Sequence, residues 1–253
     1  MKLHCIPILS ALFTSLVCFS NPATKISDNS PSSGIVIRWN DCEQTIDGFG
    51  IAQAGWAKEL FAFKNRKQVM DKMFGNDGLR LNILRGEIFP HYWENKEDKD
   101  FNLNDDINIE LCDSDFNNKS DDLLRRGQLW LTLEAKNKYH INKLVFSTWS
   151  APAWMKSNGK VSNGKLKPEC YQDFANYLAA FYKAYKSKGI TPYAISPSNE
   201  PGYAAPWNSS LWTADEMGKF ITSNLGPTFQ KENIPAKIIF GENPLWSVVM
   251  PQL

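Results

Sequence analysis

The sequence is poor in the residues that build metal centres and catalytic triads. It contains three histidines and five cysteines in 253 residues, and no two cysteines form a CxxC pair. His91 and His140 stand apart from any serine or cysteine motif. We therefore expect no metal site, no cofactor, and no serine or cysteine hydrolase triad in this chain.

The chain also lacks an excess of charge of either sign. Lysine and arginine number 28, and aspartate and glutamate number 27. Because residues 1–20 hold one basic residue and no acid, the rest of the chain is neutral. A neutral protein has no electrostatic attraction for nucleic acid or an anionic membrane. A neutral polymer such as a polysaccharide fits better as its partner.

Long apolar runs are missing, apart from a short one at the start. Residues 6–19 are apolar, follow a basic residue and precede Ser20, an order typical of a secretory signal peptide. The run is too short to span a membrane comfortably. We expect residues 1–20 to be a signal peptide, which makes the protein secreted or periplasmic without stable membrane insertion. A lipid anchor on Cys18 is less favoured, because Val17 is bulky.

Three cysteines remain after the predicted signal peptide, namely Cys42, Cys112 and Cys170. Their number is odd and their spacing matches no known disulfide framework. Three buried thiols therefore fit better than one disulfide and a free thiol, although export would permit a disulfide.

Strand-like and helix-like segments alternate after a Ser/Pro/Asn-rich stretch, residues 21–34, that predicts a mobile leader. The predicted strands are 34–39, 44–52, 78–86, 141–150, 191–198 and 236–243, and the predicted helices are 121–139, 169–189 and 213–227. Gly189 is suited to the end of the second helix, and Thr213 to the start of the third. Alternation with near-continuous apolar strands is typical of a parallel sheet buried on both faces. A doubly wound sheet and a (β/α) barrel both satisfy this pattern, with 87–120 as a long polar loop.

Polar and aromatic residues gather where the predicted strands end, and in a barrel these ends meet at one mouth. In chain order they are Gly48, Phe49, Gly50 and Trp56, then Arg85 and Glu87, then Ser147, Trp149 and Trp154, then Ser196, Asn199 and Glu200, and finally Glu242. Arginine, amide and carboxyl groups bind sugar hydroxyls, and tryptophan stacks on the C–H faces of sugar rings. The inventory therefore indicates a sugar site.

Glu200 is the best candidate for an acid that cleaves a glycosidic bond. It follows a predicted strand, Pro201 restricts its backbone, and Asn199 beside it could hold a ring hydroxyl. The same three residues could form a surface turn, but their place at a strand end favours catalysis. For Trp149 and Trp154 the alternative is core packing, and for Arg85 it is a structural salt bridge. Glu87 and Glu242 fit either the solvated rim or the site.

Four segments together resemble glycoside hydrolase family 30. They are TIDGFGIAQAGW (45–56), LRLNILRGEI (79–88), FSTWSAPAWMKSNG (146–159) and YAISPSNEPGY (193–203). They occur in the family's order, and the resemblance runs from about residue 35 to the end. The last two segments are the most specific. They look most similar to the glucuronoxylanases, with β-1,6-glucanases, β-1,6-galactanases and glucosylceramidase-like enzymes as alternatives.

The resemblance implies a (β/α)8 TIM barrel with a side β-sandwich, and retaining hydrolysis through a covalent glycosyl-enzyme. By the motif match, Glu200 becomes the general acid/base and Asn199 the contact to the sugar's 2-hydroxyl. Trp149 and Arg85 become lining residues of the cleavage subsite. Trp154 and Trp56, which also follow strand ends, complete the predicted substrate-binding set.

The sequence departs from the family's pattern at its end. The family's nucleophile is a glutamate after the seventh strand, whereas this chain stops at Leu253, shortly after the predicted fifth strand. Glu242 follows the fifth strand and is not expected to replace the nucleophile. We expect residues 35–253 to be the N-terminal part of a barrel that is monomeric when complete, with the nucleophile and most of the sandwich absent and no activity alone. A rival hypothesis is a carbohydrate-binding protein without catalysis.

Overall fold

The computed structural model describes residues 44–53, 56–93 and 123–242, together with positions 38, 40, 41, 96 and 97. The chain divides into two units, Met1–Thr45 and Ile46–Leu253, and the described strands and helices lie in the second. The predicted signal peptide, the leader, Cys42 and Cys112 lie outside the described residues, as do most of the strand 34–39 and of the loop 87–120.

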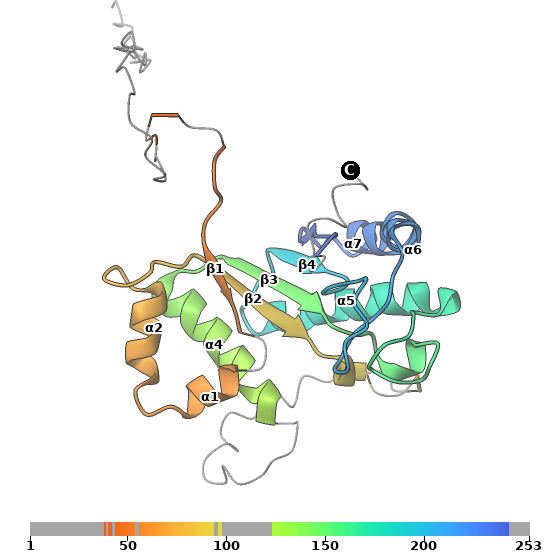
Figure 1. Cartoon of the computed structure of the whole chain (residues 1–253), viewed down its shortest axis with the longest axis horizontal. Helices are drawn as coiled ribbons and strands as arrows, with labels where there is room; N and C mark the ends of the chain where they lie inside the picture. The colour runs from red at the N-terminus through yellow and green to blue at the C-terminus, as the bar shows by residue number, and fades with distance from the viewer. Residues whose placement is uncertain are drawn as a thin grey trace, which may run out of the picture. The chain divides into compact units, whose positions relative to one another are not determined.

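A parallel sheet forms the centre of the second unit (Figure 1). Its strands are β1 (Gly50–Ala52), β2 (Ile83–Ile88), β3 (Lys143–Thr148), β4 (Ala194–Ser196) and β5 (Lys237–Ile238). Each strand pairs in parallel with the next one in the chain, in the order β1-β2-β3-β4-β5. A doubly wound sheet reverses its strand order at a switch point, whereas a barrel keeps the chain order. The topology therefore decides for the barrel.

Helices connect the successive strands. They are α1 (Ala57–Ala62), α2 (Arg66–Phe74), α4 (Leu123–Tyr139), α5 (Tyr171–Ser187), α6 (Ala214–Phe220), the π-helical turn η5 (Ile221–Leu225) and α7 (Gly226–Lys231). Short 3-10 turns occur at η1 (Pro90–Trp93), η3 (Ala153–Met155) and η4 (Pro168–Cys170). The sequence patterns missed α1 and α2 and ended the last helical segment four residues early.

Two predicted helix ends are confirmed, one at Gly189 and one at Thr213. Gly189 has a φ of +81°, and the amide of Ile190 donates to the carbonyl of Tyr185, so the chain leaves α5 through a left-handed glycine. Thr213 and Glu216 form a capping box at the start of α6.

The strand boundaries needed correction at the first two strands. Gly48 and Phe49 precede β1, so they lie at the opposite end of the strand from the predicted mouth. A side chain at Gly48 would collide with Asn82, whose Oδ1 accepts from the Phe49 amide at 3.0 Å. The second strand begins at Ile83, not at residue 78, because Arg80 adopts a left-handed φ of +53°.

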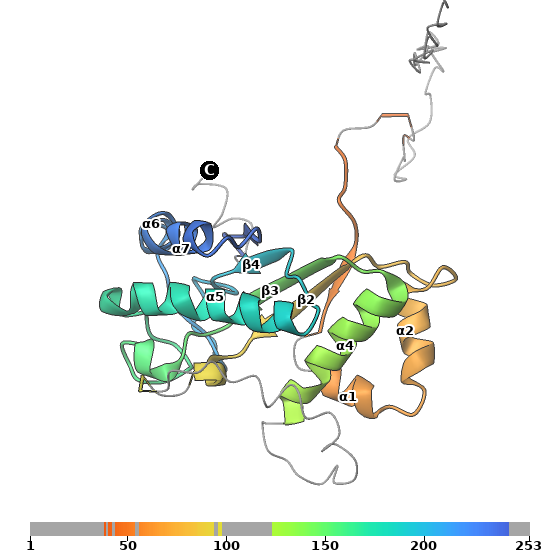
Figure 2. The same cartoon turned by 180° about the vertical axis from the view of Figure 1, so that it is seen from behind.

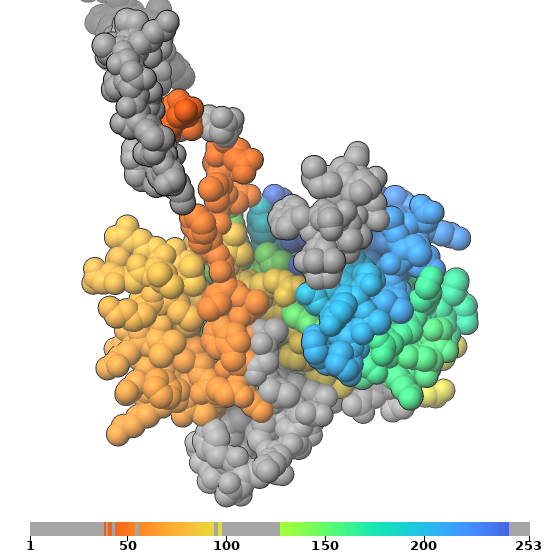
Figure 3. All heavy atoms as spheres, in the orientation of Figure 1, coloured from red at the N-terminus to blue at the C-terminus, as the bar shows by residue number. Residues whose placement is uncertain are grey.

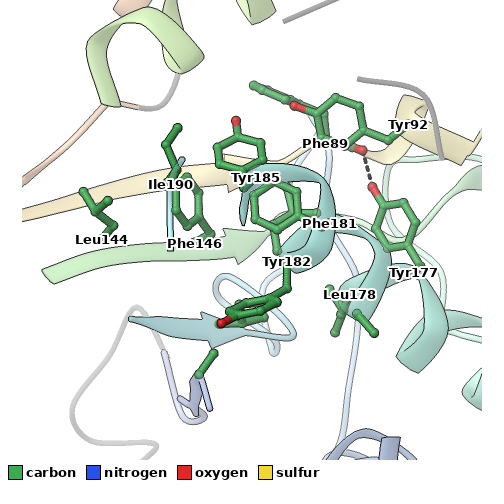
Figure 4. Packing of buried hydrophobic residues seen from close by; sticks show 14 of the residues in the cluster. Phe89, Tyr92, Leu144, Phe146, Tyr177, Leu178, Phe181, Tyr182, Tyr185 and Ile190 are labelled. Carbon is green, nitrogen blue, oxygen red and sulfur yellow. Dashed lines mark hydrogen bonds between the residues drawn. The ribbon is translucent and has the colours of Figure 1, made fainter. Parts of the chain in front are cut away.

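Alternate residues of β2 and β3 give the sheet two different faces. Figure 2 shows α4 and α5 lying over one face of the sheet. Leu84, Leu144 and Phe146 share one parity along β2 and β3 and are buried in the hydrophobic core. The ring of Phe146 lies 5.1 Å from that of Phe181 and 4.9 Å from that of Tyr185, both on α5 (Figure 4). Residues of the other parity, such as Arg85 and Ser147, point to the opposite, inner side.

Candidate active site

Arg85 lies within β2 and not after it as predicted, and its side chain meets Trp149 and Asn199, which follow β3 and β4. Nη2 of Arg85 donates to Oδ1 of Asn199 at 2.7 Å. The guanidinium carbon lies 4.6 Å from the centroid of the Trp149 ring, which is a cation–π contact. The main-chain N–H of Asn199 donates to the Thr148 carbonyl at 2.6 Å. This bond joins the segment after β4 to the end of β3. The structure thus brings together three of the residues predicted from sequence.

Glu242 belongs to the same cluster, although the sequence left its place undecided. Nε and Nη2 of Arg85 each donate to one carboxylate oxygen of Glu242 at 3.2 Å. The hydroxyls of Ser147 and Ser196 donate to Oε2 at 2.7 and 2.8 Å. Glu242 is therefore a site residue and does not stand on the solvated rim.

Glu200 follows Asn199 directly and has an unusual backbone. Its φ of +45° is left-handed, a conformation that costs a non-glycine residue about 1–3 kcal/mol and needs support from its surroundings. Its amide donates to the Glu242 carbonyl at 3.0 Å, and its own carbonyl accepts from the Tyr203 amide at 2.9 Å. Within the described ranges, no hydrogen bond or ion pair ends on its carboxylate. The carboxyl group of Glu200 is thus available to a substrate.

Trp154 and Trp56 are engaged outside this cluster. Nε1 of Trp154 donates to the Trp93 carbonyl at 3.0 Å, and the two indole rings pack edge to face at 5.4 Å. Nε1 of Trp56 donates to the Ala52 carbonyl at 2.6 Å at the start of α1. Both side chains are partly buried against the core. The geometry therefore favours the packing alternative for Trp154, and it gives Trp56 a packing role that the sequence analysis did not consider.

Glu87 is also not on the rim. Its side chain is buried, and its main chain forms two hydrogen bonds of 2.7 Å with the side-chain amide of Gln128 in α4. The alternative of a solvated rim position for Glu87 is wrong.

Lys156 is a buried lysine that the sequence patterns did not single out. Its Nζ donates to the Ser150 hydroxyl at 3.1 Å and to the Ser209 carbonyl at 2.7 Å. Burial lowers the pKa of Lys156 to about 8. The side chain fastens the segment after β3 to the segment after β4, which carries Asn199 and Glu200.

Two aromatic side chains stand exposed on the segment after β4. Tyr203 is 45% exposed and Trp207 55%, and their ring centroids lie 6.3 Å apart. Figure 3 shows this light-blue segment and the orange segment around α1 on either side of the visible atoms of β2 and β3. The aromatic pair thus offers an exposed stacking surface on the segment that follows β4.

The described residues contain no group of three histidine, cysteine or acidic side chains that could hold a metal ion. Cys170 is a free thiol, and burial raises its pKa. None of the described helices combines the length and the apolar character needed to cross a membrane.

Comparison with known proteins decides the family. Residues 46–240 match the glycosyl hydrolase family 30 TIM-barrel domain. The chain belongs to this family.

Relatives within the family carry different substrate names. The chain is 30% identical over 200 residues to putative glucosylceramidase 3 of Caenorhabditis elegans, a match that covers 75% of this chain and 37% of the relative. It is 28% identical over 237 residues to an endo-1,6-beta-D-glucanase of Neurospora crassa, covering 87% of this chain and 45% of the relative. The catalytic domain of xylanase C from Talaromyces cellulolyticus superposes with a TM-score of 0.65 at 25% identity, over 81% of this chain and 48% of that one. The chain thus spans less than half the length of each.

Proposed function

We propose that the protein is a retaining glycoside hydrolase that cleaves β-glycosidic bonds and uses Glu200 as its general acid/base. The observation that carries this proposal is the Arg85–Asn199 hydrogen bond beside an unengaged carboxyl group on Glu200. Asn199 contacts the sugar's 2-hydroxyl, while Arg85 and Trp149 line the subsite where cleavage occurs. Trp154 and Trp56 act as packing residues around it.

The reaction proceeds in two displacements. Protonated Glu200 gives its proton to the leaving-group oxygen while a second carboxylate attacks the anomeric carbon. Glu200, now ionised, then takes a proton from the water that releases the sugar from the glycosyl-enzyme.

The second carboxylate lies outside the described residues in this proposal. Glu87 is buried in the sheet, and Glu242 is committed to Arg85 and two serines. We propose further that a polypeptide ending at Leu253 does not turn over substrate, because the family resemblance leads us to expect the nucleophile after a seventh strand. Clear hydrolysis by such a polypeptide would contradict this part of the proposal.

The substrate is a polysaccharide, with xylan or glucuronoxylan as the first choice. The xylanase among the structural matches and the exposed aromatic pair Tyr203 and Trp207 support an extended glycan. A β-1,6-linked glucan and a glucosylceramide are alternatives that the names of the other relatives suggest. A β-1,6-linked galactan is a further alternative that rests on the sequence resemblance alone.

The protein is exported in this proposal and acts as a monomer. Residues 1–20 form the signal peptide, and the apolar run 6–19 supports it. N-terminal sequencing of the secreted protein checks this, and a mature chain that still begins at Met1 would contradict it.

A panel of glycans tests the catalytic proposal. The whole protein, as isolated from its source, is incubated with glucuronoxylan, β-1,6-glucan and glucosylceramide, and the first products are followed by proton NMR. We expect the β-anomer to appear first, as retention requires. The α-anomer as first product would indicate inversion and contradict the mechanism. Binding of a glycan without any product would favour the rival, a carbohydrate-binding protein.

A further inference from the structure

The carboxylate of Glu242 collects hydrogen-bond donors from three neighbouring strands. Arg85 lies in β2, Ser147 in β3 and Ser196 in β4, and all three donate to Glu242. Ser147 and Ser196 are register partners, and neither side chain is exposed. Side chains of register partners lie side by side on one face of a sheet. The two hydroxyls therefore reach the same oxygen, Oε2, from adjacent strands.

This environment fixes the carboxylate and does not leave it free to attack a sugar. Oε2 accepts from Nη2 of Arg85 and from both serine hydroxyls, and Oε1 accepts from Nε of Arg85. The side chain of Glu242 is only 20% exposed. The two bonds from Arg85 measure 3.2 Å and are bidentate, so they hold the planar guanidinium in one orientation against the carboxylate.

The fixed guanidinium also decides which way the amide of Asn199 points. The same Nη2 that binds Glu242 donates to Oδ1 of Asn199 at 2.7 Å. An arginine has donors only, so it selects the oxygen of the amide and leaves Nδ2 directed elsewhere. Trp149 lies against the guanidinium and limits its movement on that side.

We propose that Glu242 is a positioning residue: it clamps Arg85, and Arg85 holds Asn199 with Nδ2 free to contact the sugar. This inference rests on the proposed role of Asn199 as a sugar contact. Glu242 is also linked to Glu200 through the main chain, because its carbonyl accepts a hydrogen bond from the Glu200 N–H. Substitution of the side chain leaves that backbone tie in place.

The test compares Glu242→Gln with Glu242→Asp and with the control Glu232→Gln. Glutamine keeps the shape of the Glu242 side chain but has only one acceptor oxygen. Its NH2 group would face the donors of Arg85 or of the two serines. Aspartate keeps the charge. Glu232, at the end of α7, pairs with Lys183 of α5 at the surface. Its substitution removes an ion pair that shares no residue with the cluster of Arg85, Asn199 and Glu242. Side-chain NMR of the whole protein without substrate reports Arg85 Nε–H and Asn199 Nδ2–H, with the side-chain amide of Asn176 on α5 as an internal reference.

We expect Glu242→Gln to shift the NMR signals of the Asn199 side-chain amide, while those of Asn176 keep their positions. The exchange of the Arg85 Nε proton with solvent should become at least about tenfold faster. Glu242→Asp should restore part of the wild-type pattern, and Glu232→Gln should change neither signal. Unmoved Asn199 and Arg85 signals in Glu242→Gln would overturn the proposal, as would equal shifts in Glu232→Gln.

A second measurement separates positioning from nucleophilic attack. The whole protein is treated with a 2-deoxy-2-fluoro glycosyl fluoride, which traps a retaining nucleophile as a covalent ester. We expect no label on the peptide that contains Glu242, and a label there would overturn the proposal. Unchanged turnover by Glu200→Gln would contradict the proposed function, but it would leave the NMR result of Glu242→Gln as it stands.

Discussion

The two faces of β3 differ in what they contact. Leu144 and Phe146 pack into the layer formed with α4 and α5, whereas Ser147, next in the chain, donates to a carboxylate on the inner side. Apolar burial stabilises a fold by about 25 cal/mol per Å2 of surface removed from water. A buried ion pair gives little net stability, because its desolvation offsets its attraction. The outer face thus holds the sheet together, and the inner face positions charge.

Phe146→Ala should give the largest effect on stability. Removing a buried phenylalanine costs about 3–5 kcal/mol of unfolding free energy, because contacts with Phe181 and Tyr185 are lost and a cavity remains. Denaturant unfolding measures it. The matched control is Phe49→Ala, since Phe49 is 69% exposed and should change stability by less than about 0.5 kcal/mol. Equal losses in both variants would break the contrast between the faces.

Lys156 adds a dependence on pH to the segments that follow β3 and β4. Its folded pKa of about 8 is below the usual value of 10.5, so the unfolded chain binds more protons between these pH values. The free energy of unfolding should therefore rise with pH between about 8 and 10.5, by at most about 3 kcal/mol. Unfolding of wild type and Lys156→Met, measured from pH 7 to 10.5, isolates this contribution. Parallel stability curves for the two proteins would show that Lys156 does not titrate there.

Arg85→Lys should lower activity more than stability. Lysine keeps the charge but has a single side-chain nitrogen. It therefore cannot bind both oxygens of Glu242, donate to Asn199 and stack on Trp149 at the same time, as Arg85 does. Loss of a charged hydrogen bond corresponds to about a 10- to 100-fold fall in kcat/KM. Arg66→Lys is the control, because Arg66 also donates to a carbonyl and lies over aromatic rings, at α2. A similar loss in both variants would argue against a special role for Arg85.

Thr213→Ala should give the smallest effect, because the capping box belongs to neither face. It should cost about 1 kcal/mol by leaving the Glu216 amide without its cap. Thr222→Ala serves as the control, since the Thr222 hydroxyl donates to the carbonyl of Gly218 and caps no free amide. A Thr213→Ala loss above that of Phe146→Ala would reverse the expected order.

The sequence predicted the alternation, the parallel sheet and α5 because these depend on local periodicity. Tyr177, Phe181 and Tyr185 recur at helical spacing and are all buried. The short helices α1 and α2 escaped notice, although Met70, Met73 and Phe74 mark one buried face of α2. Short helices depend on tertiary packing more than on their own pattern.

The candidate site was only partly visible in the sequence. Asn199, Glu200 and Trp149 could be found from their place after a strand. Arg85 was found although it lies within β2, because the predicted strand began and ended too early. The partners of Glu242 could not be found, because hydrogen bonds between residues far apart in the chain depend on strand register. Phe49 was predicted at the wrong end of its strand because the apolar run around it shows no sharp boundary at which β1 would begin.

The turnover of Glu200→Gln most directly tests the claim that Glu200 is the general acid/base. Unfolding is measured on the same samples, so that a loss of activity is not mistaken for a loss of fold. The whole protein and the variant are assayed on glucuronoxylan, β-1,6-glucan and glucosylceramide. We expect turnover to fall about 10²- to 10⁴-fold, because glutamine cannot donate the acid proton, while the unfolding midpoint stays near that of the wild type. Unchanged turnover on the glycan that the wild type cleaves would contradict the assignment of Glu200.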